Sequence, residues 1–187
     1  MAEFDRLVVS ILVDEIIGGF FIIVPPGHIG CIYDRGRGVL PKTWSAGLHL
    51  KIPFWQVAKI FNAQTIEYSI RSGFDLKNLE AFGDEPINSV SQDNKLLQVE
   101  GAILFRIDKA MVPQLWENVG ENFVSKLVRP VSRSRVRAVM AHYNAQEIIG
   151  GKRKEIEAEV QMELEQIFHD KGLVCEKVLF SEIKPLL

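Results

Sequence analysis

A change in the spacing of apolar residues constrains the fold of this 187-residue chain more than any other feature. Between residues 95 and 107, every second position is apolar or glycine: Leu97, Val99, Gly101, Ile103, Phe105 and Ile107. A period of two puts these positions on one side of an extended strand, opposite Gln98, Glu100 and Arg106. The segment therefore predicts a half-buried antiparallel strand. Turn-forming residues 92–94 predict a hairpin that joins it to residues 90–91.

After residue 107 the spacing becomes helical. One helix is predicted to end at Gly120, and another to cover 121–143, with a new turn or a kink at Pro130. Asn144 and Glu147 have the spacing of a capping box, and 152–171 repeats apolar residues every three or four positions. Shorter strands are predicted before residue 71 and one final strand over 173–183, with a polar loop over 73–86. This order predicts an α+β fold, with a mostly antiparallel strand-rich lobe, then helices, then a last strand.

An apolar run, Ile16 to Val24, precedes the double proline Pro25-Pro26 and is the candidate membrane segment. It is too short to cross a bilayer as a helix, which takes roughly 20 apolar residues, and Asp14 and Glu15 interrupt any longer span. It suits an interfacial or one-leaflet anchor, or equally an ordinary buried strand or helix of a soluble core. If it contacts lipid, these residues do so: Ile16, Ile17, Phe20, Phe21, Ile22, Ile23 and Val24.

Motifs for catalysis, metal ions, cofactors and nucleic acids are not found in the sequence. Cys31 and Cys175 form no CxxC pair, and the four histidines lack zinc-ligand spacing. The adjacent acids Asp84-Glu85 are predicted to lie in a solvated loop rather than in an acid–base site. A net charge of −2 gives no reason to expect nucleic acid. We therefore expect no enzyme, cofactor, metal or nucleic-acid function.

Two rows of charge stand out on the predicted helices. Basic residues recur at helical spacing at Arg129, Arg133 and Arg137, and acidic residues at Glu155, Glu159 and Glu163. The simplest interpretation is two solvated faces; lipid headgroups are another partner for the basic row. A third interpretation is self-association, in which the basic row of one copy meets the acidic row of the next and sets their register.

Several segments, taken in order, resemble the prohibitin/stomatin (SPFH, or band-7) family. The entry segment is FFIIVPPGHIGCIYDRGRGVL…GLHLKIPF, followed by LQVEGAILFRID, LWENVGENFVSKLVRPVSRSRVRAVMAHYNAQEI, GKRKEIEAEV and GLVCEKVLFSEI. Together they cover nearly everything after Phe20. The resemblance implies a membrane-associated segment over 1–24, an SPFH domain over 25–184 and a tail over 185–187.

Functionally, the resemblance implies a non-catalytic membrane scaffold that self-associates and organises membrane proteins or lipid microdomains. The alternative is a peripheral adaptor that regulates a membrane-bound AAA protease or a channel without building a scaffold. Family members usually continue into a long coiled coil after the last strand, whereas this sequence stops at Leu187, as a fragment or as a short form. Arg35, Arg37 and Lys42 after the apolar run favour a cytoplasmic body if that run inserts.

Overall fold

The computed structural model describes residues 19–73 and 82–186, which form two compact units. The first, here called the β-lobe, contains the described residues up to 64 together with 109–117. The second, here called the helix–sheet unit, contains the described residues of 65–108 and 118–187. Each unit is described separately below, since each has its own core.

The β-lobe is made of two small antiparallel sheets. Strand β2 (His28–Asp34) lies between β3 (Gly38–Val39) and β5 (Gln56–Asn62), and β1 (Phe21–Val24) pairs with β4 (Gly47–Leu50) as a two-stranded ribbon. Val24, Ile32 and Trp44 form the buried cluster between them. The short helix α2 (Val112–Asn118) adds Trp116, whose ring meets that of Phe61 edge-on with centroids 5.9 Å apart.

The helix–sheet unit is organised around the longest uninterrupted alternation in the chain. Strand β9 (Leu96–Ile107) pairs with β10 (Leu173–Pro185) along one edge and with β6 (Ile66–Ile70) and β8 (Ile87–Val90) along the other. All these pairings are antiparallel; β7 (Phe82–Asp84) joins β6 in parallel. Alternate residues of β9 from Leu97 to Ile107 are buried, as the period of two predicts.

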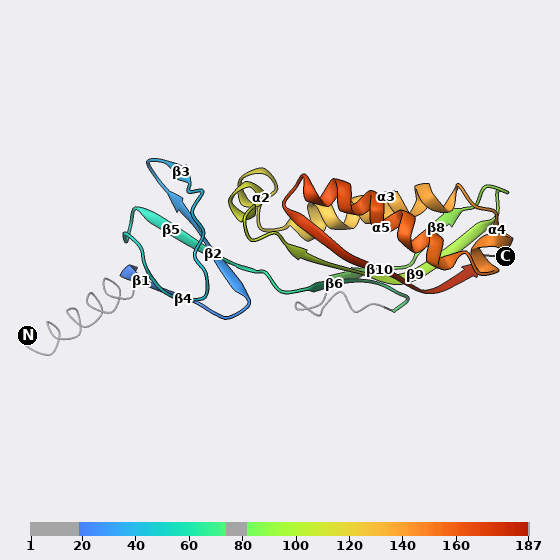
Figure 1. Ribbon diagram of the computed structural model, residues 1–187, viewed down its shortest axis with the longest axis horizontal. Coiled ribbons are helices and arrows are strands. Elements are labelled where there is room, and N and C mark those ends of the chain that lie inside the picture. The colour runs from blue at the N-terminus through green and yellow to red at the C-terminus, as the bar shows by residue number, and fades with distance from the viewer. Residues whose placement is uncertain (1–18, 74–81, 187) are drawn as a thin grey trace, which may run out of the picture. The chain divides into compact units, whose positions relative to one another are not determined.

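The helices of this unit cover the face of the sheet that β9 buries. Helix α3 (Arg129–Met140) and helix α5 (Arg153–His169) run along the sheet, with the short α4 (Ala145–Ile149) at one end (Figure 1). Phe105 of β9 meets the rings of Phe123 and Phe168 edge-on, at centroid distances of 6.4 and 6.3 Å. These aromatic contacts join the strand to the helical layer, because edge-to-face pairs add stability beyond burial alone.

The α+β fold class predicted from the sequence is confirmed, as are the hairpin β8–β9 and the capping box at Asn144 and Glu147. Two local predictions are corrected. The helix predicted over 121–143 is divided into a π-helical turn, η1 (Val124–Val128), and α3, which begins at Arg129. The new turn predicted at Pro130 is confirmed, because this proline lies in the first turn of α3, where proline is tolerated. Part of the predicted loop over 73–86 is strand β7, and its residues 74–81 lie outside the described part of the chain.

Candidate functional site

One face of the β1–β4 ribbon carries only large apolar side chains, and they are exposed. Cross-strand partners share a face, so the register Phe21↔Leu50 and Ile23↔Leu48 brings these four residues together. Their exposed fractions are 45% for Phe21, 66% for Leu50, 71% for Ile23 and 64% for Leu48. Contiguous apolar surface of this kind marks a binding site for protein or membrane more often than scattered exposed residues do. We call these four residues the ribbon face.

The opposite side of the ribbon turns toward the core of the β-lobe. Ile22 packs there against the Val24 cluster, and His49 stacks on Trp44 with ring centroids 5.0 Å apart and planes 3° from parallel. Val24 itself is only 1% exposed. Burial removes Val24 from the lipid-contacting residues proposed from the sequence, whereas Phe20, Phe21 and Ile23 remain exposed. Ile16 and Ile17, from the same prediction, lie outside the described residues.

The turn between β4 and β5 carries three more exposed apolar side chains. Ile52, Phe54 and Trp55 are 55%, 78% and 53% exposed. Phe54 has a φ of 62°, in the left-handed region that bulky residues rarely adopt. Such strain concentrates at functional positions, because the structure must hold it there against the local preference of the chain. At 78% exposure, Phe54 gains little from burial within its own lobe.

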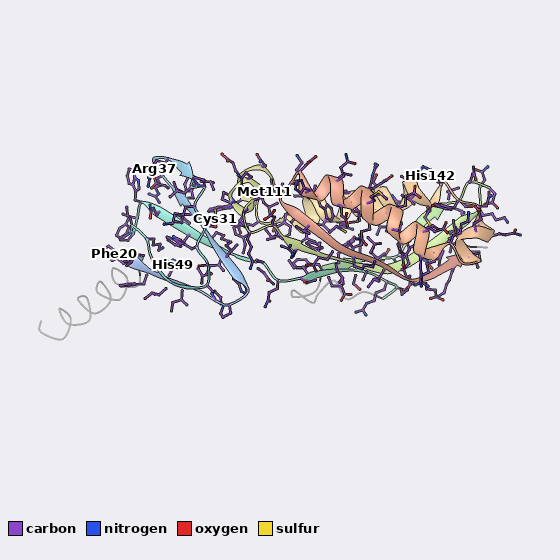
Figure 2. The ribbon with its side chains drawn as sticks, viewed as in Figure 1. Phe20, Cys31, Arg37, His49, Met111 and His142 are labelled. Atoms are coloured by element: carbon purple, nitrogen blue, oxygen red, sulfur yellow. The ribbon has the colours of Figure 1, made fainter. Side chains whose placement is uncertain are left out.

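A buried carboxylate holds the turn beside Trp55. Asp34 is 2% exposed and accepts hydrogen bonds from the Arg37 side chain at 2.9 Å and the Gln56 side chain at 3.1 Å. Its other oxygen accepts from the backbone N–H groups of Gly36 and Arg37. The Arg37 guanidinium, followed by the Gln56 amide, holds the pKa of Asp34 well below its usual range. Figure 2 shows Arg37 at this outer turn and Cys31 inside the sheet.

In the helix–sheet unit, the predicted basic row binds the segment that carries β7 and β8. Arg129 Nε and Arg133 Nη1 donate to Asp84 Oδ2 at 2.6 and 3.3 Å. Arg133 also donates to the carbonyls of Glu85 and Pro86, and Arg137 Nε donates to the carbonyl of Asn88 at 3.0 Å. The arginines are four residues apart along α3, and their partners are two residues apart along the β7–β8 segment. These two spacings match, because four helical residues rise about 6 Å and two strand residues about 6.6 Å. We call this row of contacts the arginine seam.

Asp84 is therefore a structural anion, so the solvated loop predicted for Asp84-Glu85 is wrong for Asp84, whereas Glu85 is an exposed residue in a bend. Asp84 is 7% exposed and lies within 3.5 Å of the Tyr68 hydroxyl. Burial, and then the Asp84 charge, raises the pKa of Tyr68. Sequence reasoning missed this role because Arg129 is 45 residues away from Asp84 along the chain. A groove of about 480 Å³ lies along the arginines and is lined by Ser125, Arg129, Pro130, Arg133, Ser134 and Arg137.

The predicted acidic row is also largely engaged within the chain. Glu159 accepts hydrogen bonds from the Tyr143 hydroxyl at 2.6 Å and from His142 Nδ1 at 2.9 Å. The carboxylate of Glu159 raises the pKa of Tyr143 to about 12. Glu163 pairs with Arg135 at 3.5 Å. Glu155 is exposed, as are Arg129 and Arg137 of the basic row, so these are the members that face solvent.

The remaining candidate groups do not form a reactive site. Burial raises the pKa of the Cys31 thiol to about 11 and that of Cys175 to about 12, so neither is a ready nucleophile at neutral pH. In the described residues no three histidine, cysteine or acidic side chains come close enough together to hold a metal ion. None of the helices formed by those residues has the length and apolar character needed to cross a bilayer.

Comparison with known proteins assigns the family. Residues 22–185 match the SPFH domain / Band 7 family. The chain belongs to this family. Prohibitin-1 of Schizosaccharomyces pombe is 24% identical over 160 residues, which are 86% of this chain and 51% of that protein. Prohibitin 1 of Gallus gallus is also 24% identical over 160 residues, 86% of this chain and 53% of the relative.

A third relative, Prohibitin-1, mitochondrial, of Arabidopsis thaliana, is 24% identical over 126 residues, 67% of this chain and 38% of that protein. The chain thus spans about half or less of the length of these relatives. The prohibitin-like membership expected from the sequence motifs is confirmed. The matched region runs from the ribbon to the end of β10, so it includes both units of this SPFH chain.

Proposed function

We propose that this SPFH chain is a non-catalytic, membrane-associated scaffold that docks on lipid through the ribbon face. SPFH and prohibitin relatives support a membrane-associated scaffold role in general terms, and the family is generally non-enzymatic. The observation that carries the proposal for this chain is the exposure of Phe21, Ile23, Leu48 and Leu50 on one face of the ribbon. Docking would move this surface out of water together with Phe54 and Trp55.

The energetics favour a bilayer as the partner of the ribbon face. Fully burying a leucine, isoleucine or phenylalanine side chain contributes about 1.5–3 kcal/mol. Four such side chains lie on one face of the ribbon, and the β1–β4 ladder pairs the backbone groups between the strands. The outer edges of both strands are open, so we expect shallow insertion in which the side chains enter the apolar layer and the edges stay in the hydrated interface. Trp55 is 53% exposed in the turn that follows β4, and tryptophan favours the membrane–water interface because one end of its ring is apolar and the other donates a hydrogen bond.

Vesicle flotation tests this docking. The wild-type chain is expected to float with phospholipid vesicles, and the double variant Leu48→Asp/Leu50→Asp to bind at least roughly 100-fold more weakly, since two apolar anchors become charged. Tryptophan fluorescence should shift to the blue on binding, because Trp55 is 53% exposed whereas Trp44 is buried. The matched control is Leu96→Asp/Leu179→Asp, which changes two exposed leucines of the helix–sheet unit. Equal vesicle binding by the two double variants would contradict docking through the ribbon face.

Scaffolding also requires copies of the chain to associate, and we propose that Arg137 and Glu155 contribute to this contact. Both are exposed, although Arg137 Nε also donates to the Asn88 carbonyl in the arginine seam. Arg133 is less exposed and makes three contacts in that seam, and Glu159 is held by Tyr143. The basic and acidic rows are different surfaces of one chain, so pairing them between copies gives a head-to-tail interface. Interfaces of that type close into rings when the rotation between copies allows it, and otherwise extend as filaments.

A charge swap tests the interface. Arg137→Glu should weaken self-association several-fold, because an exposed ion pair contributes about 0–1 kcal/mol and its reversal adds repulsion. Combining Arg137→Glu with Glu155→Arg should restore much of the affinity, since opposite charges then meet again. Sedimentation velocity with vesicle-free protein measures both effects. An unchanged mass distribution in the single variant would contradict the proposed Arg137–Glu155 pairing. If the wild-type protein is a monomer that still binds vesicles, the adaptor alternative is favoured, with an AAA protease among its candidate clients.

A further inference from the structure

The charges of the β-lobe are distributed very unevenly. Between residues 19 and 64 the sequence has one acidic residue, Asp34, and five basic ones, Arg35, Arg37, Lys42, Lys51 and Lys59. The α2 segment, 109–117, adds Lys109 and Glu117. The described residues of the helix–sheet unit show the reverse balance, with 16 acidic and 14 basic side chains. The excess of positive charge therefore lies on the lobe that carries the ribbon face.

Asp34 does not offset this charge at the surface. Its carboxylate is 2% exposed and is surrounded by the Arg37 guanidinium, the Gln56 amide and two backbone N–H groups. The Asp34–Arg37 pair leaves Arg35 exposed at the same turn. Asp34 is the single acidic residue between 19 and 64, so that stretch contains no second carboxylate close in sequence to Arg35, Lys42 or Lys51.

The cations lie close to the exposed apolar residues. Lys51 follows Leu50 of the ribbon face, and its backbone N–H donates to the carbonyl of Phe20 at 2.8 Å. The backbone N–H of Arg35 donates to the carbonyl of Trp55 at 3.1 Å. Lys42 is exposed in the segment that leads into β4. Long basic side chains next to apolar anchors can leave their stems in the interface and extend their charges to headgroup phosphates.

We propose that the β-lobe recognises anionic bilayers, with Arg35, Lys42 and Lys51 contacting acidic headgroups while the ribbon face enters the apolar layer. This inference rests on the proposed docking of the ribbon face and adds the chemistry of the lipid. Electrostatic attraction brings the lobe to an anionic surface, and apolar burial then holds it there. Residues 1–18 carry four acidic residues and one basic residue in sequence, so the net charge of the whole N-terminal part does not report on the β-lobe cations alone. The test therefore changes individual charges on the β-lobe.

The experiment compares neutral phosphatidylcholine vesicles with vesicles in which about a third of the lipid is phosphatidylglycerol. The wild-type chain is expected to bind the anionic vesicles at least tenfold more tightly, with the difference shrinking as salt rises from about 50 to 500 mM, because exposed charges are screened. The variant Arg35→Gln/Lys42→Gln/Lys51→Gln should lose roughly 100-fold in affinity for anionic vesicles, at about fivefold per charge, and little for neutral ones. Arg37 is kept because it holds Asp34.

The matched control, Lys154→Gln/Lys171→Gln/Lys177→Gln, removes three exposed charges from the helix–sheet unit and should bind like the wild type. Each outcome has a distinct meaning. Equal, salt-independent binding to both kinds of vesicle would overturn charge recognition and leave ribbon-face docking intact. Equal losses in the two triple variants would overturn the assignment to the β-lobe. Binding to neither kind of vesicle would overturn the docking proposal as well as this inference.

Discussion

Replacing Gly101 by valine is expected to destabilise the helix–sheet unit by about 3 kcal/mol. Gly101 pairs with Phe180 where the β9–β10 register shifts at a bulge. A Cβ at residue 101 would overlap the carbonyl oxygen of Leu179 and lie 2.9 Å from the Cα of Phe180. Both are backbone atoms, so no change of rotamer can relieve the overlap, and the two strands must separate or shift. Glycine is required here for close backbone approach.

Urea unfolding followed by circular dichroism at 222 nm measures this effect, because the longer helices belong to the helix–sheet unit. All three tryptophans, Trp44, Trp55 and Trp116, belong to the β-lobe, so their fluorescence reports separately on that unit. The control is Ala102→Val at the neighbouring, half-buried position, where a β-branched residue suits a strand and the change should be within about 0.5 kcal/mol. Similar midpoints for the two variants would show that β10 can move to accept the side chain.

Replacing Asp84 by leucine is expected to cost the helix–sheet unit about 2–3 kcal/mol. The change removes the acceptor shared by Arg129 and Arg133 and leaves Arg133, whose side chain is 21% exposed, without its anionic partner. Removing one member of a buried ion pair typically costs 3–5 kcal/mol. The expected value is smaller because Arg129 is 55% exposed and Arg133 keeps its hydrogen bonds to the Glu85 and Pro86 carbonyls.

Two further variants separate the charge effect from packing. Arg129→Gln should cost less than about 1 kcal/mol, because the Arg129 side chain is more than half exposed and water replaces its partner. The double variant Asp84→Leu/Arg133→Met should be more stable than Asp84→Leu alone, since no unpaired charge remains. Additive losses in the double variant, measured by the same urea unfolding, would show that Asp84 and Arg133 do not act as a pair.

The prediction of the fold from sequence succeeded where one physical rule acted locally. The alternation in β9 and the capping box at Asn144 depend on neighbouring residues, and the structure contains both. The prediction failed at Asp84 and at β7, because their partners are distant in sequence. Local composition made residues 82–86 resemble a loop, whereas residues 82–84 pair with strand β6 and the arginine seam binds Asp84 and the carbonyls of Glu85 and Pro86.

The candidate site, like the fold, could be predicted from the sequence only in part. The apolar run before Pro25 was visible in sequence, but Leu48 and Leu50 belong to the same surface only because β4 pairs with β1. Alternation of Leu48, His49 and Leu50 predicts that one side of a strand is apolar and does not reveal whether that side faces a core or solvent. The basic row was also visible, and yet its contact with the β7–β8 segment depends on the packing of α3 beside β8.

The sequence by itself determined the fold class, the family and the periodic elements, because spacing, turn chemistry and capping act over a few residues. The tertiary structure alone decided which apolar residues are left exposed, which carboxylates are buried and which charges remain at the surface of the β-lobe. The reason is that burial and pairing depend on strand register and helix packing between distant segments, and these bring Phe21 beside Leu50 and Arg129 beside Asp84.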